Sequence, residues 1–124
     1  MSTIFGIDHV QLAMPAGGEA LARQFYGNVL GLPEIPKPAK LALRGGVWFA
    51  CGPMQLHLGA DPEFQPAKKA HPALLVDDLD HFLQALKHNG SAINFDEQIA
   101  GFLRAFTADP FGNRIELLQP LAPT

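Results

Sequence analysis

The sequence lacks the features that mark several large classes of protein. It has one cysteine in 124 residues, so no disulfide can form within the chain, and a reducing compartment such as the cytoplasm fits. No apolar run approaches the roughly 20 residues of a membrane-spanning helix, and the first ten residues carry no charged leader or apolar core. The net charge is −3 without a basic stripe, which argues against a nucleic-acid surface. We therefore expect a cytoplasmic protein that binds neither membranes nor nucleic acid.

The residues that are abundant indicate one compact domain made of many short elements. Hydrophobic residues make up 48% of the chain, enough for a substantial core. The 12 glycines and 11 prolines are spread along the chain, where they predict frequent turns.

The two halves of the chain share one order of elements. In the first half, residues 7–14 predict a strand and 17–32 a helix that stops near Gly31, the proline-rich stretch 33–40 predicts an extended loop, and 41–59 predicts three strands.

The second half repeats this order. It predicts a strand over 71–76, a helix over 77–90 and three strands within 91–120. The fold class is thus α+β, with two tandem βαβββ modules over about 6–59 and 70–120, joined by a linker at 60–69.

Four residues that can bind metals occur at equivalent places in the two modules. His9 and His71 are assigned to the opening strands, and His57 and Glu116 to the closing strands. Because side chains alternate along a strand, His9 shares a face with Gln11, His57 with Gln55, and Glu116 with Arg114, whereas the residues between them are mostly apolar.

Three imidazoles and a carboxylate on facing sheets are a plausible set of ligands for a divalent transition metal. Such nitrogen and oxygen donors suit Zn, Ni, Co, Mn or Fe(II), and no local motif such as HExxH selects among them. The competing interpretation is that the four residues are unrelated core, surface and edge-strand residues.

Further side chains are candidates for contact with a small-molecule substrate. Gln11 and Gln55 lie on the polar faces of their strands. Trp48 and Phe49 are neighbours on one strand, so only one of them can line the cleft, and we assign Trp48 to the cleft and Phe49 to the core. Arg104 could hold an acidic group through two parallel hydrogen bonds.

The segments IDHVQLAM, FYGNVLGL, MQLHLG, AHPALLV and DPFGNRIELLQP resemble the vicinal oxygen chelate superfamily over residues 6–120. This superfamily includes glyoxalase I, fosfomycin-resistance transferases, extradiol dioxygenases and bleomycin-resistance proteins. The resemblance implies paired modules around a U-shaped cleft, a metal held at its base by His9, His57, His71 and Glu116, and a homodimer whose chains complete the cleft together.

The resemblance implies three functions. The favoured one is a metal-dependent glyoxalase-like lyase or isomerase in which Glu116 also serves as general base. Glyoxalase I carries Glu or Gln where this chain has His57. An Fe(II) dioxygenase would use His9, His71 and Glu116 and leave His57 beside the metal. A binding protein without turnover, as in antibiotic resistance, is the third.

Overall fold

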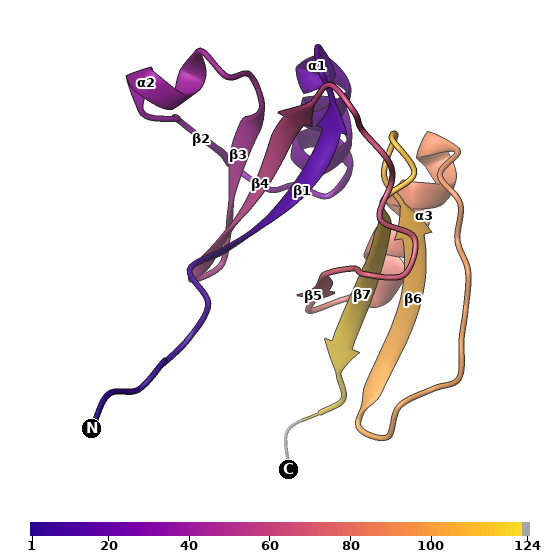
Figure 1. Ribbon diagram of the computed structural model, residues 1–124. Helices are drawn as coiled ribbons and strands as arrows, with labels where there is room; N and C mark the ends of the chain where they lie inside the picture. Colours follow the sequence, from indigo (N-terminus) through magenta and orange to yellow (C-terminus); the bar gives the residue numbers. More distant parts are fainter. Residues whose placement is uncertain (123–124) are drawn as a thin grey trace.

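The computed structural model describes residues 1–122, which form two separate mixed β-sheets (Figure 1). The first sheet has the order β1-β4-β3-β2 and the second has the order β5-β7-β6. In each sheet the opening strand lies parallel to the closing strand, because β1 pairs with β4 and β5 pairs with β7. The strands are β1 (His9–Pro15), β2 (Glu34–Ile35), β3 (Val47–Cys51), β4 (Met54–Asp61), β5 (Ala73–Leu75), β6 (Phe102–Ala108) and β7 (Arg114–Pro120).

Each module contributes one main helical segment. In the first, α1 (Glu19–Ala22) continues into the π-helical η1 (Arg23–Val29), and a short α2 (Ala39–Ala42) follows later. In the second, α3 (Leu79–Asn89) begins where the Asp78 side chain accepts a hydrogen bond from the backbone N–H of His81. It ends at Gly90, whose φ of 77° is the left-handed conformation that glycine adopts without strain. These boundaries confirm the helix predicted over 77–90.

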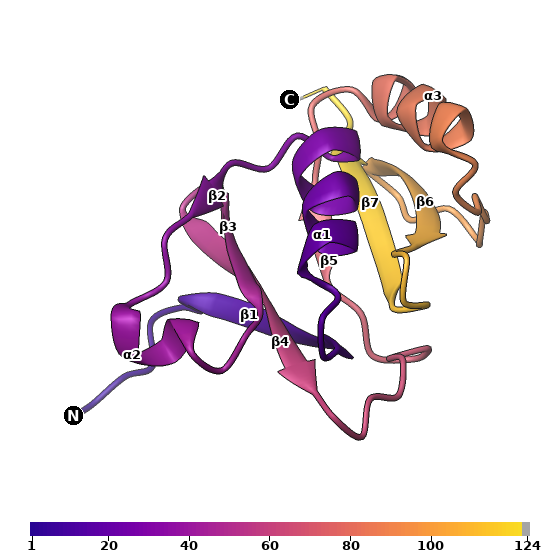
Figure 2. The same ribbon diagram turned by 90° about the horizontal axis from the view of Figure 1, so that it is seen from above.

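The helical segments of the two modules contact each other, and each packs against the sheet of its own module, with α3 beyond β6 and β7 in Figure 2. η1 contacts both α3 and β3, and α3 contacts β6 and β7. The buried residues form one shared core, to which β1 contributes Leu12 and Met14, and β7 contributes Ile115 and Leu117. Since alternate residues of a strand point to opposite faces, the polar faces of both sheets point away from this core.

A buried polar network ties the modules to each other. The Tyr26 hydroxyl, on η1, donates a 2.6 Å hydrogen bond to Asp109 in the turn between β6 and β7. Asn113 donates through its amide both to Asp109 and to the backbone carbonyl of Ala13 on β1. Burial, together with the Asp109 charge, raises the pKa of Tyr26 well above its ordinary value, so its hydroxyl remains a donor. The DPFGN turn therefore has a structural role.

The structure corrects three predicted elements. Residues 39–40, expected in the loop, and 41–42, expected in a strand, form α2, and the first sheet takes its edge strand β2 from the loop expected over 33–40. Pro38 has the fixed φ that suits a helix start, and Ala-Lys-Leu-Ala are strong helix formers, which outweighs the short apolar pattern.

The third corrected element lies in the second module, where the strand expected within 91–101 is reduced to a single bridge between Asn94 and Phe106. The second sheet consequently has three strands among the described residues. His71 also lies outside a strand, because β5 starts two residues later, after Pro72.

Candidate metal centre

The polar face of the first sheet carries a stack of three aromatic rings. The Trp48 and His57 rings lie 3.9 Å apart at 4°, and the His57 and His9 rings lie 4.2 Å apart at 15°. The pairing of β3 with β4 places Trp48 opposite His57, and β1 lies on the other side of β4. Phe49 points into the core, and Trp48 lies on the polar face against His57.

The hydrogen bonds of this face orient both imidazoles. His9 Nδ1 lies 2.9 Å from the Asp8 carboxylate, so when it donates there the lone pair is on Nε2. His57 Nε2 lies 2.8 Å from Gln55 Oε1, which leaves the lone pair on Nδ1. His57 is only 3% exposed, and this burial lowers the pKa of its imidazole, helped by the neighbouring His9. Neutral imidazole is the form that binds metals.

A cavity of about 360 Å³ opens beside the stack. The amide of Gln11 lies across Gly59 there, and a Cβ on that glycine would come within 2.8 Å of it. Lys37 and Arg44 also line this cavity. Gln11 is therefore positioned on this face, as predicted, whereas Gln55 is engaged with His57.

The second sheet carries the other half of the predicted site. Glu116, 6% exposed, faces His71 Nε2 through Oε1 at 2.9 Å and accepts a hydrogen bond from Arg104 through Oε2 at 3.3 Å. His71 Nδ1 lies 2.9 Å from the backbone carbonyl of Lys69, to which it can only donate. In the neutral ring the lone pair is then on Nε2, which faces the carboxylate.

The Arg104 side chain holds the Glu116 carboxylate in position. Its Nε donates to the backbone carbonyl of Glu97 at 2.8 Å, and its Nη1 donates to Glu116, so its donors are directed to protein groups. The predicted role in substrate binding thus becomes one of positioning a carboxylate.

The four predicted ligands lie in two separate pairs within one chain. His9 and His57 are on the outer face of the first sheet, and His71 and Glu116 are on that of the second. Over residues 1–122 no group of three or more His, Cys, Asp or Glu side chains is placed to hold a metal ion. Residues 1–122 of a single chain therefore do not form the cleft expected to join all four, since each pair lies on the polar face of its own sheet.

The donors nevertheless fit a divalent metal in their chemistry. A metal-bound imidazole commonly donates its other N–H to a carboxylate or a carbonyl, and His9 and His71 both have such a partner. When the His71 ring is neutral, its Nε2 lone pair faces Glu116 Oε1 at 2.9 Å, an arrangement that a proton on Nε2 or a shared cation satisfies. The His9 side chain is 45% exposed, whereas His57 is buried.

Sequence reasoning missed the residues that orient these ligands. Asp8 directly precedes His9, a spacing that is visible in the sequence but common by chance. The Lys69 carbonyl carries no sequence signal. Arg114, noted only for sharing a face with Glu116, stacks its guanidinium on the ring of Phe106 at 3.9 Å.

Comparisons with known proteins identify the family to which this fold belongs. The chain matches the family model of the Glyoxalase/Bleomycin resistance protein/Dioxygenase superfamily over residues 6–117, and it belongs to that superfamily. A glyoxalase family protein from Bacillus anthracis is 47% identical, with a TM-score of 0.92 over 97% of this chain and 98% of that one.

More distant structures share the fold. Lactoylglutathione lyase from Agrobacterium tumefaciens is 20% identical, with a TM-score of 0.72 over 95% of this chain and 96% of that one. TnmS3, an antibiotic binding protein from Streptomyces sp. CB03234, is 22% identical, with a TM-score of 0.73 over 97% and 99%. The comparison with curated proteins finds no match.

Proposed function

We propose that the protein is a divalent-metal-dependent, glyoxalase-like enzyme that acts on a small substrate with neighbouring oxygens. The observation that carries the proposal is the presence of two half-sites, each with two ligands already oriented by hydrogen bonds. His9 and His57 form one half, and His71 and Glu116 form the other. The proposed enzyme is cytoplasmic, in keeping with its free cysteine, Cys51.

The complete site would form in a homodimer, with one half-site from each chain. Both sheets end in strands without a second neighbour, β1 and β5, and such edges pair readily with another chain. Large apolar side chains are exposed beside them, including Phe5 at 98%, Ile7 at 66% and Leu75 at 70%. An apolar cavity of about 500 Å³ lies at the same end of the sheets and is also lined by Ile7 and Leu75. A second copy would cover this surface.

The residues have distinct roles in the proposed reaction. When bound, a divalent ion supplies Lewis-acid stabilisation of the charge that develops as a proton leaves carbon beside a carbonyl. Glu116 is the buried carboxylate of its face, and we assign it to accept that proton. Arg104 keeps the Oε2 atom of Glu116 in place, which leaves Oε1 facing His71. Trp48 covers one face of the His57 ring and keeps that imidazole in place.

Metal content measured together with molar mass tests the proposal. Protein stripped with a chelator and reloaded separately with Zn, Ni, Co, Mn or Fe(II) is passed through size exclusion with light scattering and elemental analysis. We expect a dimer with one ion per chain, and loss of the ion in Glu116→Gln. Lys87→Gln, an exposed change on α3, is the matched control and should keep it. A dimer that cannot be loaded would refute the enzyme and favour a binding protein.

A dioxygenase with three protein ligands is the second candidate, and the ring stack favours it. The His9 and His57 rings are nearly parallel and 4.2 Å apart, and the lone pair of each ring lies in the plane of that ring. The two lone pairs therefore do not converge on one ion that is about 2 Å from each nitrogen. If His9 turns and His57 stays, then His9, His71 and Glu116 form the two-His, one-carboxylate set of Fe(II) oxygenases. Oxygen uptake on catechols by the iron form would establish this function. Turnover with Ni, Co or Zn and without oxygen uptake would exclude it.

A further inference from the structure

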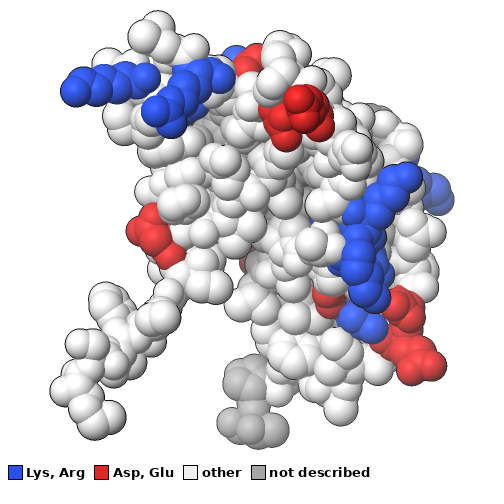
Figure 3. Space-filling model, viewed as in Figure 1, with Lys and Arg blue, Asp and Glu red and all other residues white. Residues whose placement is uncertain are grey.

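The cations of this acidic protein gather at the proposed site. The net charge is −3, yet of the nine Lys and Arg residues, Lys37 and Arg44 line the cavity on the first sheet, and Lys68 and Arg114 line one on the second. Figure 3 shows the same distribution, with blue side chains over α2 and beside β6. Charge concentrated in this way indicates a negatively charged ligand.

The two arginines of the second sheet differ in how their donors are used. Arg104 is bonded to Glu97 and Glu116, as described above. The Arg114 guanidinium makes no hydrogen bond to the described part of the chain. It rests on the Phe106 ring at 3.9 Å, and its ionic partner is Asp96, 3.9 Å away. Its planar set of N–H donors is therefore held in place by stacking and left available.

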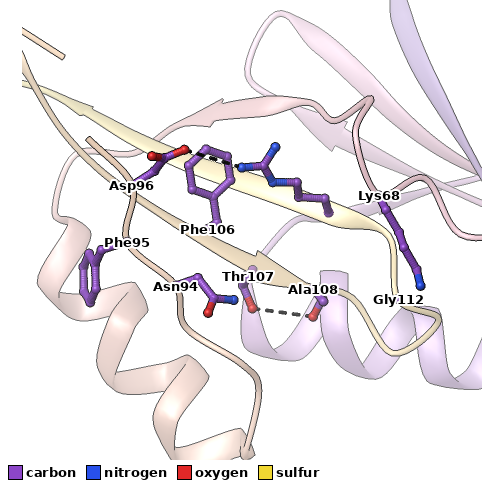
Figure 4. A pocket seen from close by; sticks show the side chains of 9 residues that line it. Lys68, Asn94, Phe95, Asp96, Phe106, Thr107, Ala108 and Gly112 are labelled. Carbon is purple, nitrogen blue, oxygen red and sulfur yellow. Dashed lines mark hydrogen bonds and ion pairs between the residues drawn. The ribbon is translucent and has the colours of Figure 1, made fainter. Parts of the chain in front are cut away.

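Arg114 lines a cavity of about 360 Å³ on the outer face of the second sheet. Figure 4 shows Phe106 and Thr107 along one side of it, with Asp96 and Lys68 at its two ends. Lys68 is exposed at the rim and adds a second positive charge. The cavity thus combines an apolar ring with two cations, a combination that suits a small organic anion.

Asp96 marks the place that such an anion would take. Its Oδ2 lies 3.9 Å from Arg114 and 4.0 Å from Arg104, the outer limit of an ion pair, and its side chain is 56% exposed. A carboxylate at these distances and exposure is weakly held. A ligand oxyanion closer to the guanidinium would replace it at little cost.

The register of β7 limits the size of the ligand. Arg114 and Glu116 are two residues apart on the same face, which corresponds to about 7 Å along a strand. The proposed ligand would place its paired oxygens near the metal ligand Glu116 and an oxyanion on Arg114. It can therefore have only a few atoms between these two ends.

We propose that Arg114 determines substrate specificity by binding an oxyanion, so that the substrate is a compact acid with neighbouring oxygens at one end and a carboxylate or phosphate-like group at the other. This inference rests on the proposed function for its metal-facing end. The anion-binding part involves the second sheet alone and can be measured without metal.

The first test uses metal-free protein and two probes, inorganic phosphate and acetate, which separate tetrahedral from planar anions. NMR signals of the arginine side-chain N–H groups are followed at constant ionic strength. We expect saturable shifts of the Arg114 signal with one probe or both. Arg114→Gln should weaken binding at least tenfold, Asp96→Asn should strengthen it, and Lys87→Gln should leave it unchanged. Shifts that do not saturate, or equal affinity in Arg114→Gln, would overturn the proposal.

The second test uses the metal-loaded dimer with glycerol 3-phosphate, which has neighbouring oxygens and a phosphate, and glycerol as its neutral counterpart. We expect glycerol 3-phosphate to bind at least tenfold more tightly than glycerol, and Arg114→Gln to abolish that preference. Equal binding of the two would refute the assignment of Arg114. Failure of metal loading with intact phosphate binding in the first test would instead refute the proposed function and leave the anion site standing.

Discussion

Subunit complementation provides the sharpest prediction, because the two half-sites lie on different sheets of one chain. One variant, His9→Ala with His57→Gln, removes the ligands of the first sheet. The other, His71→Ala with Glu116→Gln, removes those of the second. Gln at 57 and 116 keeps most of the buried side-chain volume, and His9 and His71 are partly exposed, so we expect both variants to fold.

The expected metal content follows from pairing the two chains at random. Each variant alone should bind no metal, since every site in its dimer lacks two ligands. In an equal mixture about half of the dimers pair one variant with the other, and each of these has one intact site of two. The mixture should therefore recover about 0.25 ion per chain, and heterodimer purified through two different tags about 0.5.

The assay is co-expression of the two variants, tandem affinity purification and elemental analysis, with near-ultraviolet circular dichroism to verify folding. Each variant co-expressed with itself under two tags serves as the control. A folded heterodimer without metal would refute the division of the site between chains. A wild-type protein that is monomeric and fully loaded would refute it as well.

Three further predictions concern the core, the ring stack and metal removal. Tyr26→Phe removes the buried 2.6 Å hydrogen bond to the Asp109 carboxylate and should lower the free energy of unfolding by about 1.5–3 kcal/mol in urea titration; a loss under about 0.5 kcal/mol would show that the network does not hold the modules together. Fluorescence of Trp48, the single tryptophan, should fall as the stacked His57 gains a proton, with a midpoint below the ordinary imidazole pKa. Because burial lowers the pKa of His57, the unfolded chain takes up the proton at a higher pH than the folded chain does. The contribution of His57 to stability is therefore present at neutral pH and is lost as the pH falls from the pKa of the unfolded chain towards that of the folded chain. A fluorescence midpoint at or above the ordinary imidazole pKa would contradict the effect of burial. Chelator treatment of the loaded dimer should lower its melting temperature, since an ion at 100 times its dissociation constant stabilises the folded state by about 2.7 kcal/mol; an unchanged melting temperature would mean that no ion was bound.

Local signals in the sequence were sufficient for part of the fold. Asp78 and Gly90 mark the two ends of α3, and each does so through hydrogen bonds to residues only a few positions away from it in the sequence. The alternation along β1, β4 and β7 also predicted which side chains share a polar face, because that face depends only on the period of the strand. Family membership, expected from five short segments, is confirmed over residues 6–117.

Other features depended on contacts that no local pattern contains. The segment 91–101 pairs with β6 at Asn94 alone, and 39–42 form a helix where the sequence predicted a loop followed by a strand. Arg104 is engaged because Glu97 in a loop and Glu116 on β7 both accept its hydrogen bonds, whereas Arg114 has only Asp96 as an ionic partner, at 3.9 Å.

The sequence by itself determined the fold class, the helix ends and the inventory of possible ligands, since these depend on periodicity, caps and residue type. The tertiary structure decided how the ligands are grouped. Because η1 packs against the first sheet and α3 against the second, the polar faces point away from the helices, and the histidines of the first sheet form a pair separate from His71 and Glu116. Which side of a sheet the helices cover is a property of the packed chain, and it separates the two half-sites.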